Sequence, residues 1–175
     1  MESGWLARRA AGWIERQRRT HRPHAEPMPA DACDRLAHFF DPATLEPVRV
    51  RRVTRVEPPA GLGYLGRLSP LALDFDRVYG ITFIDTILVA QDLAPEAARV
   101  DCLFHECVHV AQYRLLGLGG FVRSYLAGWV GAGYRYDAIP LEREAYSLQR
   151  RFVSAPEAVF SVEAEIAGGS RPQYG

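Results

Sequence analysis

Apolar residues recur every three or four positions between residues 95 and 116, which is the spacing of an amphipathic α-helix. The apolar face of this segment holds Val100, Leu103, Phe104, Cys107, Val108, Ala111 and Leu115. Pro95 suits the first turn of a helix, and Gly117 suits the position just past the last turn. We therefore predict a helix from Pro95 to Leu116. A polar stripe beside its apolar face holds Asp101, His105, His109 and Gln112.

Two more helices are predicted further along the chain. Residues 121–130 are expected to be helical after a turn at residues 118–120. A stronger helical pattern begins at Pro140. Its inward positions are Leu141, Ala145, Leu148 and Phe152. Residues 134–139 are expected to form the loop between these helices, and one or two more helical turns are expected after Ala155.

Two segments rich in β-branched residues are predicted to form strands. Residues 45–56 interleave valines with arginines, although the alternation is irregular. Residues 77–90 are predicted to form two short strands or one bent ribbon. A short helix is expected at residues 31–40, and a turn-rich loop at residues 58–63. The strand nearest the long helix would offer its free edge to an extended peptide.

The amino-terminal segment is basic and amphipathic. Its apolar residues at helical spacing are Trp5, Leu6, Ala10, Trp13 and Ile14. A helix over residues 3–19 would either pack on the domain with its arginines in water, or contact a membrane surface or a partner protein. Prolines rule out regular structure in residues 21–29. We divide the chain into this helix and linker (1–29), one domain (30–167) and a frayed tail (168–175).

Composition limits the classes of protein to which the chain could belong. A chain of 175 residues with 48% hydrophobic residues is expected to form one globular domain. The formal net charge is zero, so nucleic acid is not an expected partner. The cysteines are Cys33, Cys102 and Cys107, an odd number that indicates free thiols and not a disulfide framework. Neither a membrane-spanning run nor a signal peptide is recognisable, and we expect a cytoplasmic protein.

The motif His105-Glu106-Cys107-Val108-His109 lies in the middle of the predicted long helix. Positions four residues apart on a helix differ by about 40° in azimuth, so both imidazoles project from one face and can hold one metal ion. Glu106 points to the side of that ion, where a carboxylate takes a proton from metal-bound water and does not ligate the metal. The motif therefore predicts a zinc site with His105 and His109 as ligands and Glu106 as the general base.

A catalytic zinc site normally has three protein ligands and one water molecule, so the histidine pair requires a third partner. No histidine follows His109 in the chain. Gln112 and Leu115 occupy the positions at which metzincins carry a glycine and a third histidine, which excludes that pattern. The remaining candidates are the carboxylates of Asp137, Glu142 and Glu144.

These residues resemble the gluzincin metallopeptidases, in which a second helix supplies a glutamate ligand with a small residue three positions later. Glu142 matches the ligand position and Ala145 the small residue, while Glu144 is the second choice. Many gluzincins have an aspartate where this chain has Tyr146. The resemblance covers residues 78–148 and is strongest to minimal bacterial domains of this type. It implies an α+β, zincin-like fold in which a small sheet packs against the HExxH helix and a glutamate-bearing helix.

The resemblance also implies an activity, namely hydrolysis of peptide bonds in a peptide or protein substrate. Zn²⁺ would be held by His105, His109 and Glu142, and Glu106 would activate the zinc-bound water. Gln112 or a tyrosine hydroxyl would orient one of the imidazoles.

A tyrosine hydroxyl is also expected to stabilise the oxyanion that develops on the substrate. Tyr134, Tyr136 and Tyr146 are candidates, and we prefer Tyr136 because it lies on the loop before Glu142. Two other functions fit the same residues. One is a catalytically silent zinc-binding scaffold or interaction module, although such a site has no need of Glu106. The other is a zinc hydrolase that acts on a non-peptide amide.

Overall fold

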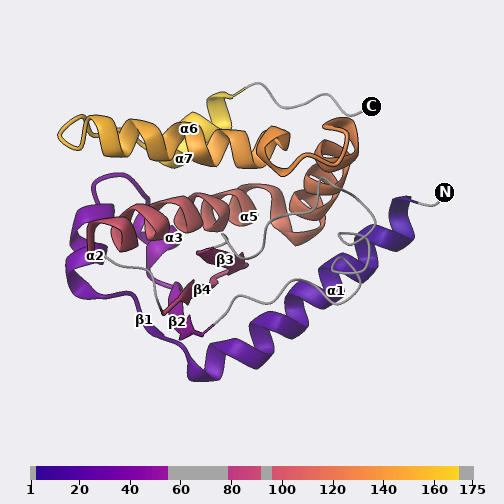
Figure 1. Cartoon of the computed structure of the whole chain (residues 1–175), viewed down its shortest axis with the longest axis horizontal. Helices are drawn as coiled ribbons and strands as arrows, with labels where there is room; N and C mark the ends of the chain where they lie inside the picture. Colours follow the sequence, from indigo (N-terminus) through magenta and orange to yellow (C-terminus); the bar gives the residue numbers. More distant parts are fainter. Residues whose placement is uncertain (1–2, 55–78, 92–95, 170–175) are drawn as a thin grey trace.

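A computed structural model describes residues 3–54, 79–91 and 96–169 of the chain. Within these ranges the fold is α+β, with six α-helices packed around a small mixed sheet of four strands (Figure 1). The α-helices are α1 (Ser3–His21), α2 (Ala30–Leu36), α3 (Pro42–Leu45), α5 (Glu96–Gly131), α6 (Pro140–Ser154) and α7 (Val162–Gly168). The short 3-10 helices are η1 (Arg22–His24) and η3 (Tyr136–Ala138). The strands are β1 (Glu26–Pro27), β2 (Arg49–Val53), β3 (Gly80–Phe83) and β4 (Thr86–Ala90).

The strands lie in the order β1-β2-β4-β3, which makes β3 an edge strand of the sheet that the described residues form. Strands β2 and β4 are parallel, and the other two pairs are antiparallel. Ile84 and Asp85 form the tight turn between β3 and β4, and Ile84 has a φ of 65°. The prediction of two short strands in residues 77–90 is therefore confirmed for the part of that range that the structure describes.

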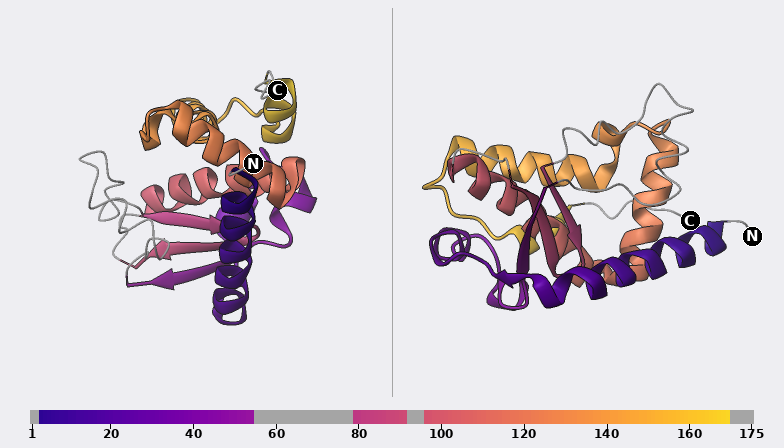
Figure 2. Two further views of the ribbon diagram at one scale, coloured as in Figure 1. Left: turned by 90° about the vertical axis from the view of Figure 1, so that its right-hand side faces the viewer. Right: turned by 60° about the horizontal axis from the view of Figure 1, so that its bottom comes forward.

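Helix α5 crosses the sheet, and α6 lies along α5 on the side away from the strands (Figure 1). Figure 2 shows the same layers from two further directions, with the strands and α1 on the other side of α5 from α6. The larger apolar cluster contains Phe104 of α5 at its centre, in contact with Phe39 and Phe152. A second cluster joins Ile14 of α1 to Phe121 of α5. The long helix therefore contributes to both clusters and holds the layers together.

The middle of helix α1 packs on the domain, which is one of the two arrangements expected for this segment, whereas Trp5 and Leu6 near its start are exposed. Ile14 is buried, and the ring of Trp13 meets the ring of Phe83 edge-on with the centroids 5.3 Å apart. Near the other end of α1, the Arg18 guanidinium donates to both carboxylate oxygens of Asp85, at 2.6 and 2.7 Å. Among the residues that the structure describes, no helix has both the length and the apolar character needed to cross a membrane.

Helix α5 bends at Gly117, where φ is 66° and ψ is 161°. The first part of the helix ends where it was predicted to end, because glycine adopts a positive φ without the steric cost of a Cβ atom. The prediction of a turn over residues 118–120 was wrong, since the chain returns to helical geometry directly after the bend and continues to Gly131. One glycine is sufficient to redirect the chain, and Figure 1 shows the second part of α5 pointing in a new direction.

Two predictions for the amino-terminal half need correction. The strand expected over residues 45–56 begins only at Arg49, because the preceding residues form the helical turn α3. Glu163 stabilises that turn by accepting hydrogen bonds from the Asp41 amide and the Thr44 hydroxyl. The linker expected to lack regular structure contains η1 and the short strand β1. Proline is tolerated in the first turn of a helix and on an edge strand, which explains the error.

Other boundaries differ by a few residues. The helix expected over residues 31–40 ends at Leu36 and is followed by a turn. The helix predicted to start at Pro140 is confirmed, and the further helical turns expected after Ala155 are present as α7. The predicted loop at residues 58–63, the helix start at Pro95 and most of the predicted tail lie outside the described residues.

Candidate metal centre

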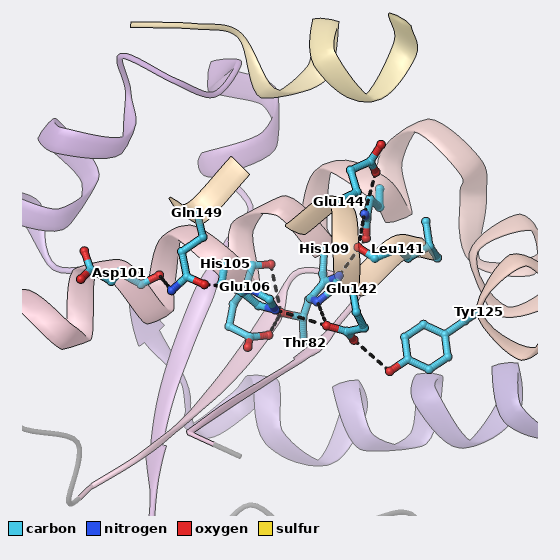
Figure 3. Close-up of polar contacts among 11 residues, drawn as sticks. Thr82, Asp101, His105, Glu106, His109, Tyr125, Leu141, Glu142, Glu144 and Gln149 are labelled. Atoms are coloured by element: carbon cyan, nitrogen blue, oxygen red, sulfur yellow. Dashed lines mark hydrogen bonds and ion pairs between the residues drawn. The ribbon is translucent and has the colours of Figure 1, made fainter. Parts of the chain in front are cut away.

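Two histidines of α5 and one glutamate of α6 converge on one point (Figure 3). His105 Nε2 and His109 Nε2 each lie 3.4 Å from Glu142 Oε2, and the three potential ligand atoms all lie within 4.8 Å of one another. The exposed fractions of these residues are only 6%, 6% and 3%. Both histidines project from the same face of α5 because they are one turn apart, and Glu142 comes from the first turn of α6.

Gln112 determines which ring nitrogen of His109 carries the proton. This glutamine is fully buried, and its amide nitrogen donates to the Leu141 carbonyl at 3.0 Å and to Glu144 Oε2 at 2.9 Å. Its amide oxygen is therefore the atom that lies 2.8 Å from His109 Nδ1. Because an amide oxygen can only accept, Nδ1 carries the proton, and Nε2 of the neutral ring presents a lone pair. Gln112 thus has the orienting role expected for it.

Gln149 has the same relation to His105. The amide nitrogen of Gln149 donates to the Asp101 carbonyl at 3.0 Å, which leaves its amide oxygen 3.2 Å from His105 Nδ1. The proton of the neutral His105 ring is therefore also on Nδ1, and its Nε2 lone pair faces Glu142.

The two oxygens of the Glu142 carboxylate have different environments. Oε1 accepts a hydrogen bond from the Tyr125 hydroxyl at 2.9 Å. Oε2 is buried and receives no hydrogen bond, although it faces the Nε2 atoms of His105 and His109. Three lone pairs thus point at one buried place, and a buried acceptor without a donor is unfavourable. A cation would satisfy all three, so these residues fit a metal ion.

A proton can partly substitute for that cation. Burial alone would lower the pKa of His109, but the nearby negative charge of Glu142 outweighs burial and raises this pKa to about 9. Burial alone would raise the pKa of Glu142, but the two imidazoles lower it well below its ordinary value. The ion pair of a protonated histidine with Glu142 and a bound metal ion are therefore alternatives, and metal binding must displace a proton.

Glu106 lies beside this cluster and is not one of its members. Its carboxylate is almost completely buried, and the Thr82 hydroxyl on β3 donates to its Oε2 at 2.7 Å. Among the described residues, the cluster has three potential ligands and no fourth. The site therefore offers a carboxylate next to, but separate from, the point where a cation would be held.

The three tyrosines proposed as oxyanion donors lie in different places. Tyr136 on η3 is partly buried, and its pKa is raised well above the ordinary value, mainly by burial and next by the nearby charge of Glu142. Tyr146 places its ring against His105, with the centroids 4.4 Å apart. Tyr134 is 51% exposed and packs on Trp129, away from the histidines. Tyr136 and Tyr146 thus adjoin the cluster, and Tyr134 does not.

The two other candidate acids are not at the cluster. Glu144 accepts a hydrogen bond from Gln112, and so supports the amide that orients His109. Asp137 is exposed and pairs with Arg135 at 2.8 Å. Glu142 is therefore the acid that the structure brings to the histidines.

Three residues of this site were not identified from the sequence, and for one of them, Thr82, the strand pattern gave no sign of a contact with Glu106. Gln149 lies on the inward face of α6, two turns after Glu142, and a polar residue on an otherwise apolar face was a usable signal. Tyr125 had no such signal. It reaches Glu142 only because α5 bends at Gly117 and directs its second part toward α6.

No protein-family model matches this chain, and neither the curated proteins nor the solved structures contain a match. The class of the protein therefore follows from its own structure. It is an α+β protein with a buried His-His-Glu cluster that could hold a metal ion.

Proposed function

We propose that this chain is a zinc-dependent metallopeptidase of the gluzincin type with a zincin-like fold. The observation that carries the proposal is the convergence of three potential ligand atoms, namely His105 Nε2, His109 Nε2 and Glu142 Oε2, the last of which has no hydrogen-bond partner. Two glutamine amides direct both imidazole protons away from this point. In the neutral form of each ring, this leaves the Nε2 lone pair free to bind a cation at that point.

The donor set favours zinc among the common cations. Two imidazole nitrogens and one carboxylate oxygen are typical ligands of catalytic zinc, whereas calcium and magnesium prefer sites made of oxygen atoms. Three protein ligands leave one coordination position for water. Bound zinc would lower the pKa of that water and polarise the carbonyl group of a substrate.

The remaining steps belong to side chains of this chain. Glu106 takes a proton from the attacking water molecule and later delivers it to the leaving amine. Tyr136, close to Glu142, is our choice for the donor that stabilises the developing oxyanion. Tyr146, whose ring lies against His105 at a tilt of 52°, is the second choice for that donor.

The sheet supports a peptide as the substrate. β3 is an edge strand, and it lies next to α5, from which Glu106 and the histidines project. An extended peptide can add to such an edge through main-chain hydrogen bonds alone. This arrangement would place a scissile carbonyl between the strand and the metal site.

The test is to measure zinc content and peptide cleavage together on purified protein. Wild type should bind one zinc ion per chain and cleave members of a peptide library. Glu106→Gln should retain the zinc and lose cleavage, and Glu142→Ala should lose most of the zinc. Glu157→Gln, which changes an exposed glutamate, is the matched control and should behave as wild type. Retained cleavage in Glu106→Gln, or retained stoichiometric zinc in Glu142→Ala, would contradict these assignments.

The burial of the cluster favours one alternative, a zinc-binding scaffold without turnover. Structural zinc sites are closed to solvent, and all three potential ligands here are less than 9% exposed. Zinc binding without cleavage of any peptide would support the scaffold. Cleavage of non-peptide amides but not of peptides would instead identify a different zinc hydrolase.

A further inference from the structure

The side chain of Thr82, on the edge strand β3, contacts the carboxylate of Glu106. The Thr82 hydroxyl lies 2.7 Å from Glu106 Oε2 and 3.1 Å from the backbone carbonyl of the same residue. Both residues are buried, with exposed fractions of 7% for Thr82 and 5% for Glu106. The contact therefore lies inside the protein, where water cannot readily replace a lost hydrogen bond.

A hydroxyl has one proton and cannot donate to both of these acceptors at once. The Glu106 carbonyl lies within α5, where the backbone amide one turn later provides its donor. The carboxylate has no such donor from the helix, and its oxygen is also the nearer of the two. The Thr82 proton therefore goes to Oε2. No described residue donates to Oε1, which remains available to accept a proton.

Gly80 provides the space in which this carboxylate lies. A Cβ atom at residue 80 would be 2.6 Å from Glu106 Oε1 and 2.9 Å from Glu106 Cδ and Cys102 Sγ. Side chains two residues apart on a strand point to the same face, so Gly80 and Thr82 both face α5. The carboxylate thus lies along the strand, with Oε2 at the threonine hydroxyl and Oε1 over the glycine.

We infer that Thr82 is a positioning residue, which holds Glu106 by Oε2 and leaves Oε1 as the atom that receives the proton. Gly80 makes the arrangement possible because it has no side chain. The inference rests on the proposed function in treating Glu106 as the general base. The position of the carboxylate itself is independent of any activity.

The experiment compares three threonine variants in the zinc-loaded protein. Thr82→Val keeps the shape of the side chain and removes the donor, and should lower kcat for peptide cleavage by roughly 10- to 100-fold, with KM and zinc content close to wild type. Thr82→Ser keeps the donor and should recover most of the lost kcat. Thr86→Val is the control, because Thr86 is also buried but its hydroxyl bonds to Asp85. It should leave kcat unchanged.

Gly80→Ala tests the space for the carboxylate. It should lower kcat by at least as much as Thr82→Val while the protein retains its zinc, because the added methyl group displaces the carboxylate and not the histidines. Wild-type kcat in this variant would overturn the role given to Gly80.

A second measurement does not depend on activity. Urea unfolding of the metal-free protein is compared for wild type, Thr82→Val, Glu106→Leu and the double variant. If Thr82 donates to the buried carboxylate, the effects of Thr82→Val and Glu106→Leu on the unfolding constant should not be independent. The double variant should differ by about tenfold from the product of the two single effects. The same cycle between Thr86→Val and Glu106→Leu should show no coupling.

These outcomes separate the inference from the proposed function. If wild type cleaves no peptide, the proposed function fails, and the unfolding cycle still decides whether Thr82 holds the carboxylate. If wild type cleaves peptides but Thr82→Val is as fast, or Thr82→Ser recovers nothing, the positioning role is overturned and the peptidase stands. Absence of coupling in the unfolding cycle also overturns it.

Discussion

Gln112 is buried and holds His109, so we predict that Gln112→Met lowers both the stability of the domain and the zinc affinity of the proposed site. Methionine has a similar volume but makes none of the hydrogen bonds of the amide. The change leaves the His109 Nδ1 proton without its acceptor, and it removes one hydrogen bond each from the Leu141 carbonyl and from Glu144 Oε2. An orphaned buried group costs about 1–3 kcal/mol and a lost hydrogen bond about 1 kcal/mol, so the variant should lose about 2–4 kcal/mol of stability.

The same change should weaken zinc binding, because nothing then holds His109 in the tautomer that directs a lone pair at the metal. Loss of a partner that orients a ligand typically lowers metal affinity by roughly 10- to 100-fold. Gln149→Met is the matched control. Gln149 is only partly buried and its contact with His105 is longer, at 3.2 Å against 2.8 Å, so water should replace part of what is lost. We expect this control to lose about 1 kcal/mol of stability and to bind zinc less than about tenfold more weakly than wild type.

Urea unfolding in the presence of a chelator gives the stability of both variants, and competition with a chromophoric chelator gives their zinc affinity. Wild-type stability and affinity in Gln112→Met would refute the tautomer reasoning. If Gln149→Met lowered stability and zinc affinity as much as Gln112→Met, burial and hydrogen-bond length would not explain the relative importance of the two glutamines.

Four more predictions follow from the pKa shifts and from close packing. Glu142 raises the pKa of His109 to about 9 against the effect of burial, so zinc binding at pH 7.5 should release about one proton, measured by calorimetry in buffers of different ionisation enthalpy. In the metal-free protein the same pair stabilises the fold below about pH 6.5 and ceases to do so as pH rises through about 9, which pH-dependent unfolding would show. Burial would raise the pKa of Asp85, but Arg18 lowers it below 3.8, so Asp85→Asn should cost about 1 kcal/mol at pH 7, and the difference should vanish as the pH falls below 3.8. Gly128→Ala places a Cβ atom 2.6 Å from the proline ring that begins α6 and should lower stability by about 1–3 kcal/mol, whereas Gly131→Ala, with open space around it, should not.

The resemblance that suggested Glu142 as the third ligand agrees with the place of that residue in the structure. Glu142, Ala145 and Leu148 recur at helical spacing and share the buried face of α6, whereas Glu144 lies off that face. The sequence could therefore rank the two glutamates. It could not establish that this face of α6 meets the histidine face of α5.

The local properties of the chain were determined by the sequence alone. Two histidines one turn apart must share a face of any helix that contains them, and a glycine at residue 117 permits the helix to end there. Both features depend on backbone geometry over a few residues, and this geometry is the same in any fold.

Only the tertiary structure decided which distant groups complete the site. Tyr125 reaches Glu142 through the bend at Gly117, and Thr82 reaches Glu106 because β3 is the strand next to α5. These contacts join segments far apart in the chain, and they depend on crossing directions that no short pattern encodes. Helical periodicity could place the two histidines and Glu142 on their helices, but the packing of helix on helix and of helix on strand determined what holds them and Glu106 in position.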